Sequence, residues 1–246
     1  MTQNIYDDDT FFKKYSQMDR SVKGLAGAGE WQTLEAMLPD LHDKRLLDLG
    51  CGFGWHAQYA MAHGARSVIG VDISAKMLAE ARRKNRYDAV RYIEQPIEAI
   101  DFPPHSFDCV LSSLALHYLA SFADIAAKVY TLLTPGGDFV FSVEHPVFTA
   151  YGSQDWIYTA DGEIAHFPVD RYFEEGPRQA IFLGETMTKY HRTLTTYLDT
   201  LLTLGFTLTA VKEPQPSPEQ LAELPEMRQE LRRPMMLLVA AHKPSK

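Results

Sequence analysis

Residues 46–56 read LLDLGCGFGWH, and this stretch limits the possible folds more than any other part of the chain. A short apolar run typical of a buried strand leads into Gly50, Gly52 and Gly54. Glycine is used where a backbone turns tightly or approaches a ligand closely. A turn that joins a strand to a helix also exposes backbone N–H groups that can bind a ligand. Asp48, just before the turn, would place an acceptor facing the loop.

Two kinds of nucleotide site use such a glycine turn. The dinucleotide pattern G-x-G-x-x-G fits Gly50 and Gly52, but Trp55 occupies its third position. The pattern D-x-G-x-G-x-G that starts at Asp48 resembles instead the first motif of the class I S-adenosylmethionine-dependent methyltransferases. The resemblance implies that the loop wraps the amino-acid end of S-adenosylmethionine, with Asp48, Gly50, Cys51 and Gly52 as binding residues.

A second acidic position supports an adenosine-containing cofactor. Residues 67–72 are rich in β-branched side chains and predict a strand that ends at Asp72. An acid about 20 residues after the glycine turn can accept hydrogen bonds from both ribose hydroxyls. Dinucleotide and methyltransferase sites share this role, so Asp72 does not choose between them. Ile73 and Met77 would then line the adenine, although Met77 could equally serve packing alone.

The third predicted strand, residues 90–94, leads into a departure from the methyltransferase pattern. The family often has Asp near the adenine amino group at the position of Pro96. Proline has neither an N–H nor an acceptor side chain, so that acidic contact is in doubt. The resemblance leaves the backbone of Ile97 as an adenine contact, and Gln95 or Glu98 could replace the missing acid.

The later segments complete an α/β pattern. Residues 101–111, DFPPHSFDCVL, resemble the family segment that enters the fourth strand, and residues 133–143, LTPGGDFVFSV, resemble its turn before a fifth strand over 138–143. Ser112 and Ser113 lie where the strand order would reverse, a place where open α/β sheets bind ligands. With two closing strands, the resemblance implies a mostly parallel, doubly wound sheet of seven strands in the order 3-2-1-4-5-7-6, in one domain spanning 1–246.

The N-terminal residues 1–44 are expected to form helices. Aromatic and apolar spacing predicts an amphipathic helix over 8–23. The simple interpretation is a helix packed at the domain edge. The family resemblance implies that this segment lies over the cofactor, where Tyr15 could touch it and Arg20 could pair with its carboxylate.

Residues 144–192 interrupt the alternation of strands and helices. The segment is dense in aromatic residues, predicts a hairpin over 156–164 around an Asp-Gly turn, and predicts a strand over 179–187. A structureless loop of this length is uncommon in a compact domain. We therefore expect a small, β-rich, aromatic cap over the cofactor crevice. A homodimer interface is the alternative, because aromatic residues also serve interfaces.

The composition limits the kinds of partner that the protein could bind. The net charge of −8 and the lack of a long basic run disfavour a nucleic-acid or membrane-surface binder. Only two cysteines are present and no CxxC pair, which favours a cytoplasmic setting and no metal site. The acidic N-terminus does not resemble a signal peptide, and no apolar run reaches the length of a membrane span. A small, partly apolar acceptor molecule is the expected substrate.

Catalytic residues are harder to predict. Methyl transfer from a sulfonium depends mainly on holding the reacting atoms in line, and a base is needed only if the acceptor O, N or C atom must lose a proton. His117, His145 and His191 are the candidate bases, because each borders a segment expected at the carboxyl edge of the sheet. An NAD(P)-dependent oxidoreductase and a non-catalytic methyltransferase-fold binding protein remain as alternatives.

Overall fold

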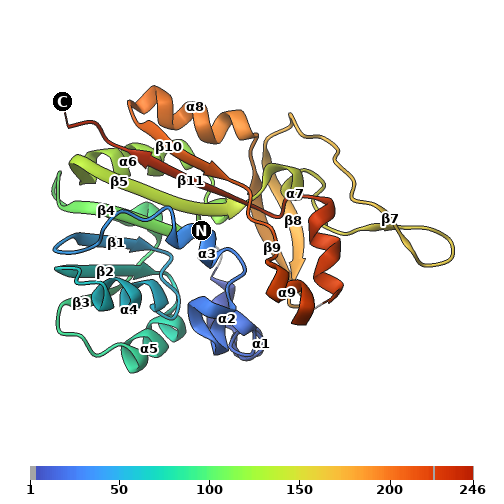
Figure 1. Ribbon diagram of the computed structural model, residues 1–246, viewed down its shortest axis with the longest axis horizontal. Coiled ribbons are helices and arrows are strands. Elements are labelled where there is room, and N and C mark those ends of the chain that lie inside the picture. The colour runs from blue at the N-terminus through green and yellow to red at the C-terminus, as the bar shows by residue number, and fades with distance from the viewer. Residues whose placement is uncertain (1–3, 224, 246) are drawn as a thin grey trace.

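The computed structural model describes residues 4–223 and 225–245, and it is built around one seven-stranded sheet (Figure 1). The order is β10-β11-β5-β4-β1-β2-β3, which confirms the predicted 3-2-1-4-5-7-6 arrangement. The first five strands run parallel, and β11 lies antiparallel between β5 and β10. The strands are β1 Arg45–Leu49, β2 Ser67–Asp72, β3 Val90–Glu94, β4 Phe107–Ser113, β5 Leu133–Glu144, β10 Thr207–Lys212 and β11 Met236–His242.

Helices cover both faces of the sheet, so its central strands are buried on both sides. α6 (Phe122–Leu132) and α8 (Leu194–Leu204) pack on one face, and α3 (Trp31–Glu35) and α4 (Trp55–Ala62) pack on the other. α5 (Ala75–Lys84) connects β2 to β3. Strands buried on both faces read as apolar runs, as Leu46 and Leu47 of β1 and residues 109–111 of β4 do, with the polar residues placed towards the strand ends.

Local signals set where the main helices begin and end. The hydroxyls of Ser74 and Thr193 accept hydrogen bonds from backbone N–H groups in the first turns of α5 and α8, at 3.1 Å each. Gly205 ends α8 with a left-handed φ of 96°. These are the side-chain N-caps and glycine C-cap that satisfy orphan backbone groups at helix ends.

The N-terminal segment differs from the prediction of one helix over 8–23. It forms two short helices, α1 (Asp9–Tyr15) and α2 (Asp19–Val22), between the 3₁₀ turns Ile5–Asp7 and Gly24–Gly27. Met18 separates the helices with an extended backbone. Helices this short are held by tertiary packing rather than by propensity, so the contacts beneath them decide where each one ends.

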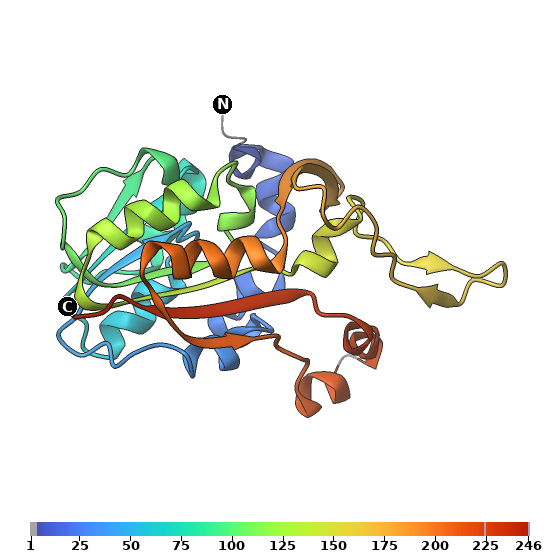
Figure 2. The same cartoon turned by 90° about the horizontal axis from the view of Figure 1, so that it is seen from above.

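Residues 144–192 form a helical turn and two separate hairpins. Their elements are α7 Pro146–Ala150, β6 Ile157–Tyr158, β7 Ile164–His166, β8 Gly176–Phe182 and β9 Glu185–His191. β6 and β7 form the hairpin predicted over 156–164, and they project away from the body of the molecule (Figure 2). The strand predicted over 179–187 is wrong, because the chain turns at Leu183 and Gly184, both with positive φ, to pair β8 with β9. Leucine rarely occupies such a turn, so the sequence indicated only weakly that the chain turns here.

Two further features complete the fold. β5 begins at Leu133 instead of the predicted 138, because its ladder with β4 continues through an irregularity between Phe107 and Cys109. The chain then closes with α9 (Pro218–Glu223) and a 3₁₀ turn, Pro225–Arg232, before β11. Among the described residues, no helix is long and apolar enough to cross a bilayer.

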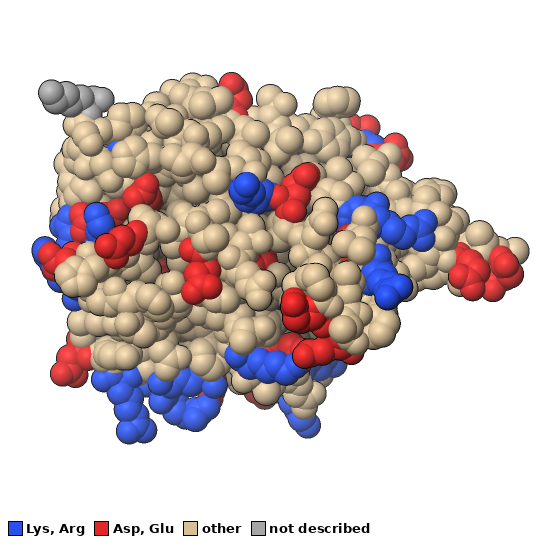
Figure 3. Space-filling model, in the orientation of Figure 1, with Lys and Arg blue, Asp and Glu red and all other residues tan. Residues whose placement is uncertain are grey.

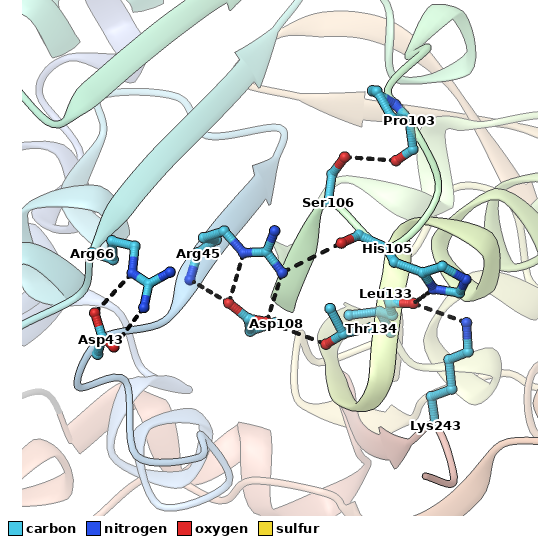
Figure 4. Close-up of polar contacts among 10 residues, drawn as sticks. All are labelled: Asp43, Arg45, Arg66, Pro103, His105, Ser106, Asp108, Leu133, Thr134 and Lys243. Carbon is cyan, nitrogen blue, oxygen red and sulfur yellow. Dashed lines mark hydrogen bonds and ion pairs between the residues drawn. The ribbon is translucent and has the colours of Figure 1, made fainter. Parts of the chain in front are cut away.

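An ion pair between β1 and β4 stabilises the amino edge of the sheet, at the opposite end of β1 from the glycine turn. Arg45, at the start of β1, donates through Nε and Nη2 to Asp108 of β4 at 2.9 Å each, and its backbone N–H donates to the same carboxylate (Figure 4). Thr134 donates to Asp108 as well. On the face shown in Figure 3, acidic and basic side chains are interspersed, and basic ones gather along the lower edge near α5.

Candidate functional site

A cavity of about 370 Å³ lies at the carboxyl ends of β1, β2, β4 and β5. Its walls come from four parts of the chain that are distant in sequence: the N-terminal segment, the glycine turn, the loops after β3 and β4, and the hairpin β8–β9. This is the edge of an open α/β sheet at which ligands bind. Of the predicted cofactor residues, these line it: Tyr15, Arg20, Gly50, Cys51, Gly52, Asp72, Ile73, Met77, Pro96, Ile97 and Ser113.

The glycine turn has a backbone that only glycine adopts readily. Gly50, Gly52 and Gly54 have φ values of 76°, 50° and 73°. A Cβ on Gly50 would lie 2.4 Å from the Cβ of Ala115, and one on Gly54 would lie 2.2 Å from the hydroxyl of Tyr92. Apart from the chain neighbours of Gly52, no atom of the described residues lies within 4 Å of the corresponding position on Gly52. The outer two glycines therefore allow close packing, while Gly52 leaves open space over the loop.

Asp72 lies at the end of β2 with its carboxylate fixed beneath this loop. One oxygen accepts the N–H of Gly52 and the other accepts the N–H of Ser74, both at 2.9 Å. Each carboxylate oxygen has capacity for a further hydrogen bond, so both can still receive a ribose hydroxyl. Burial raises the pKa of Asp72 above its ordinary value. A flat apolar surface for adenine lies beside it, made by Ile73, Met77 and Ile97.

Three predicted cofactor residues lie outside the cavity lining. Ser112 is buried and donates to the carbonyl of Leu49 at 2.8 Å, which ties β4 to the end of β1. The backbone N–H of Gln95 donates to the carbonyl of Asp72 at 3.0 Å, so this residue supports the end of β2 from the neighbouring loop. Asp48 lies beneath the glycine turn.

Asp48 is the least satisfied acid of the site. It is fully buried, and neither of its oxygens has a hydrogen-bond partner among the described residues. Burial, with a smaller contribution from the charge of Asp72, raises the pKa of Asp48 to about 8. The Nδ1 atom of His56 is 3.8 Å away, and burial lowers the pKa of His56 to about 4. Both side chains are therefore neutral at pH 7 in the ligand-free protein.

An ion pair from the N-terminal segment faces the cavity beside the glycine turn. Arg20 of α2 pairs with the buried carboxylate of Glu30, and Ser113 donates to the same carboxylate at 3.3 Å. The N-terminal segment is fixed over this region by Asp7, which accepts the Ser74 hydroxyl at 2.6 Å and the Lys76 N–H at 3.1 Å. Arg20 was predicted from the sequence as a binding residue, and Glu30 was not.

Where the loop after β4 and the strand β9 line the cavity, His117 lies beside Glu144 and Lys189. His117 follows β4 and is 1% exposed; its Nδ1 accepts the backbone N–H of Glu144 at 3.4 Å. Burial lowers the pKa of His117 to about 4. Lys189 of β9 donates to Glu144 at 2.6 Å and to Gln154 at 2.9 Å. Tyr6 and Tyr118 lie in the same wall with their hydroxyls 3.4 Å apart.

The other two candidate histidines are held elsewhere. His145 begins α7, where its Nδ1 accepts the N–H of Val147 at 3.0 Å and its Nε2 lies 2.8 Å from Glu213. The ring of His191 lies between the hydroxyl of Thr149 and the carbonyl of Tyr172, at 2.8 Å each. Neither histidine lines the cavity.

His145 was predicted from the sequence as a site residue, but its neighbour Glu144 is the one that lines the cavity. Successive residues of a strand point to opposite faces, so only one of this pair can face the cavity. That alternation was available in the sequence. Lys189 and Glu30 carried no comparable signal, because only the tertiary fold brings β9 and the start of α3 to this edge of the sheet.

The residues present fit the cofactor that the sequence suggested. The carboxylate of Asp72, the open space above Gly52 and the apolar wall at Ile97 match a ribose and an adenine. The pair Arg20 and Glu30 offers a cation and an anion, which match the carboxylate and ammonium of an amino acid. These features occupy one continuous cavity.

Comparisons with known proteins agree with this fit. Residues 47–141 match the family model Methyltransf_11, a methyltransferase domain. A solved structure of a proposed S-adenosylmethionine-dependent methyltransferase from Listeria monocytogenes is 57% identical, with a TM-score of 0.85 over 89% of this chain and 99% of that one. An S-adenosylmethionine-dependent methyltransferase from Mesorhizobium loti is 44% identical, with a TM-score of 0.83 over 89% and 100% of the two chains.

A more distant relative matches only part of its own length. The malonyl-[acyl-carrier protein] O-methyltransferase of Enterobacter lignolyticus is 40% identical over 109 residues, which are 44% of this chain and 42% of that protein. The family model, the two nearly full-length structural matches and the cavity thus agree. This chain belongs to the class I S-adenosylmethionine-dependent methyltransferases, and S-adenosylmethionine is its cofactor.

Proposed function

We propose that the protein transfers a methyl group from S-adenosylmethionine to an O, N or C atom of a small molecule bound in the same cavity. One observation carries this proposal: a single cavity runs from Asp72 and the glycine turn to His117, Glu144 and the hairpin β8–β9. Donor and acceptor could therefore meet without leaving it. The family assignment does not favour the nicotinamide oxidoreductase alternative.

Residues of the chain itself would hold the cofactor. Asp72 would accept the two ribose hydroxyls, and Ile97 with Met77 would contact the adenine. Arg20 would bind the carboxylate of the methionine part and Glu30 its ammonium, each exchanging its present partner for the ligand. S-adenosylmethionine supplies an electrophilic methyl group on a sulfonium, so the protein needs mainly to position the two reactants.

Two segments would exclude water from the reaction. Tyr6 and Tyr15, with Arg20, close the cavity from the N-terminal side, and Phe182, Met187 and Lys189 close it from the hairpin β8–β9. We assign residues 144–192 the role of a cap on this basis. A dry site strengthens every electrostatic contact made inside it. The malonyl-[acyl-carrier protein] O-methyltransferase supports oxygen as one acceptor atom, but its similarity covers less than half of each chain.

Thermal unfolding with S-adenosylhomocysteine tests the proposed cofactor site. A ligand at 100 times its Kd stabilises the folded state by roughly 2.7 kcal/mol. For a chain of this size, we expect the melting temperature to rise by about 5–10 °C. Asp72→Ala should remove this shift, because it deletes the ribose acceptor.

The matched control is Asp88→Ala, an exposed acid in the turn after α5. It should keep the full shift. The same shift in Asp72→Ala as in the wild type would contradict the assigned ribose site. No shift with S-adenosylhomocysteine in the wild type would support a methyltransferase fold that has lost its cofactor, with Pro96 as the first residue to examine.

A further inference from the structure

We propose that the acceptor is a carboxylic acid, bound as its carboxylate against His117 and Lys189, and that the product is its methyl ester. This inference rests on the proposed function and concerns the part of the cavity that His117, Glu144 and Lys189 line. It follows from the hydrogen-bonding groups there, which can donate to a ligand, and from the finding that neither His117 nor Glu144 is placed to act as a base.

His117 is a donor at this site. Its Nδ1 accepts the backbone N–H of Glu144 at 3.4 Å, so the proton of the neutral imidazole is on Nε2. Burial lowers the pKa of His117 to about 4, which keeps the ring neutral near pH 7. Nε2 has no hydrogen-bond partner among residues 4–223 and 225–245. It can donate to an acceptor oxygen, and in this tautomer it cannot take a proton.

Glu144 is not available as a base either. One of its oxygens accepts from Lys189 and the other from Gln154, at 2.6 Å each. Burial opposes the ionisation of Glu144, but the protonated form of His117, the Lys189 ammonium and the hydrogen bonds from Lys189 and Gln154 together outweigh that and lower its pKa. A carboxylate with a low pKa and both oxygens engaged is a poor proton acceptor.

The remaining polar groups at this end are donors. The Lys189 ammonium has three N–H groups, and its partners among the described residues are Glu144 and Gln154. A third N–H is left for a ligand. Tyr6 and Tyr118 share the wall, and burial raises the pKa of both, so they stay protonated. The Tyr6 hydroxyl donates to that of Tyr118 at 3.4 Å, which leaves the Tyr118 proton for a ligand. Such a set of donors matches an anionic oxygen group.

A carboxylate is also an acceptor whose chemistry needs no base. One of its oxygens forms a bond to the methyl carbon, the methyl–sulfur bond breaks, and that electron pair stays on sulfur. The negative charge of the acceptor and the positive charge of the sulfonium cancel, and no proton is released. Opposite charges attract more strongly in a dry cavity than in water, which favours this neutralisation. A hydroxyl or amine acceptor would have to give up a proton.

The body of the acid should be apolar. Leu119, Phe182, Met187 and Met236 line the same part of the cavity. Methionine side chains adapt to irregular apolar shapes, so this wall suits a short alkyl or aryl chain without specifying one.

Binding to the protein loaded with S-adenosylhomocysteine tests the proposal. The probes are hexanoate, octanoate and phenylacetate, each compared with the alcohol and the amine that carry the same body. We expect at least one acid to raise the melting temperature of the loaded protein, and to bind more tightly by calorimetry than its alcohol and its amine. The proposal is overturned if the amine or the alcohol binds more tightly than the acid in every set, or if no acid binds.

A double variant tests the residues. Glu144→Gln with Lys189→Met removes both charges together, so no buried charge is left unpaired. It should weaken acid binding by about tenfold, which corresponds to 1.4 kcal/mol, and leave the shift with S-adenosylhomocysteine unchanged. Unchanged acid binding overturns the assignment of Lys189. If the wild type shows no shift with S-adenosylhomocysteine, the proposed function fails and this inference fails with it; a normal shift without preference for acids removes only the inference.

Discussion

Replacing Asp48 with asparagine should stabilise the ligand-free protein, although Asp48 belongs to the glycine-turn motif. The carboxyl group is fully buried, and neither oxygen has a hydrogen-bond partner among the described residues. Burial and the charge of Asp72 raise its pKa to about 8. The unfolded chain ionises this group freely near pH 4. Asparagine has the same shape and no charge, so Asp48→Asn removes the cost of keeping the group neutral.

The sign and size of the effect follow from this raised pKa. A group whose pKa is raised by folding contributes its full stability below the unfolded pKa and loses it as pH rises towards the folded pKa. Between about pH 4 and pH 8, each pH unit costs the wild type roughly 1.4 kcal/mol. The advantage of Asp48→Asn should therefore grow by about 3 kcal/mol between pH 5.5 and pH 7.5.

Urea unfolding followed by tryptophan fluorescence, on protein freed of bound cofactor, measures this difference at both pH values. Asp88→Asn is the control, because Asp88 is exposed and should show no change with pH relative to the wild type. The comparison cancels every titrating group that the variant and the wild type share. A difference that stays constant between the two pH values, or shrinks as pH rises, would refute the argument that Asp48 is buried and neutral.

Three further changes test other parts of the structure. Asp108→Asn should cost about 2 kcal/mol at pH 7, because Arg45 holds the pKa of Asp108 at about 2; the loss should fade as pH falls from about 4 to 2, as measured by urea unfolding. Asp7→Ala should release the N-terminal segment, speed trypsin cleavage there and weaken binding of S-adenosylhomocysteine, because it removes the contacts to the start of α5. Gly50→Ala should destabilise the protein by roughly 3 kcal/mol and abolish ligand binding in thermal unfolding, since it adds a clash with Ala115 at a positive φ.

The sheet could be predicted from the sequence because its strands are buried and separated by clear turn and helix signals. The predicted bounds 67–72 and 90–94 agree with β2 and β3. The segments that failed are those in which tertiary packing decides. The turn at Leu183 lacks the usual Asn-Gly or Asp-Gly signal. The break at Met18 interrupts a helical pattern that continues on both sides of it.

The site residues also fall into two groups, those that the sequence predicts and those that only the fold brings to the cavity. Asp72 could be found because a fixed position in the fold, the end of the second strand, carries its role. Glu30 and Lys189 could not, since segments far apart in the chain bring them to the cavity. His117 was selected as a base by its residue type and by its place after the fourth strand. Burial and the N–H of Glu144 determine its proton position, and neither is visible in the sequence.

The distribution of charge along the cavity connects the two ends of the site. The lining residues at the donor end include the acids Glu30, Asp72 and Glu98, with Arg20 as the cation among them. At the acceptor end, Lys189 balances Glu144, and the remaining N–H and O–H groups of Lys189, His117 and Tyr118 can donate to a ligand. A surplus of carboxylates favours a cationic sulfonium, and a set of donors favours an anion. The protein would thus hold opposite charges at the two ends of one dry cavity, and methyl transfer between them would cancel both charges without moving a proton.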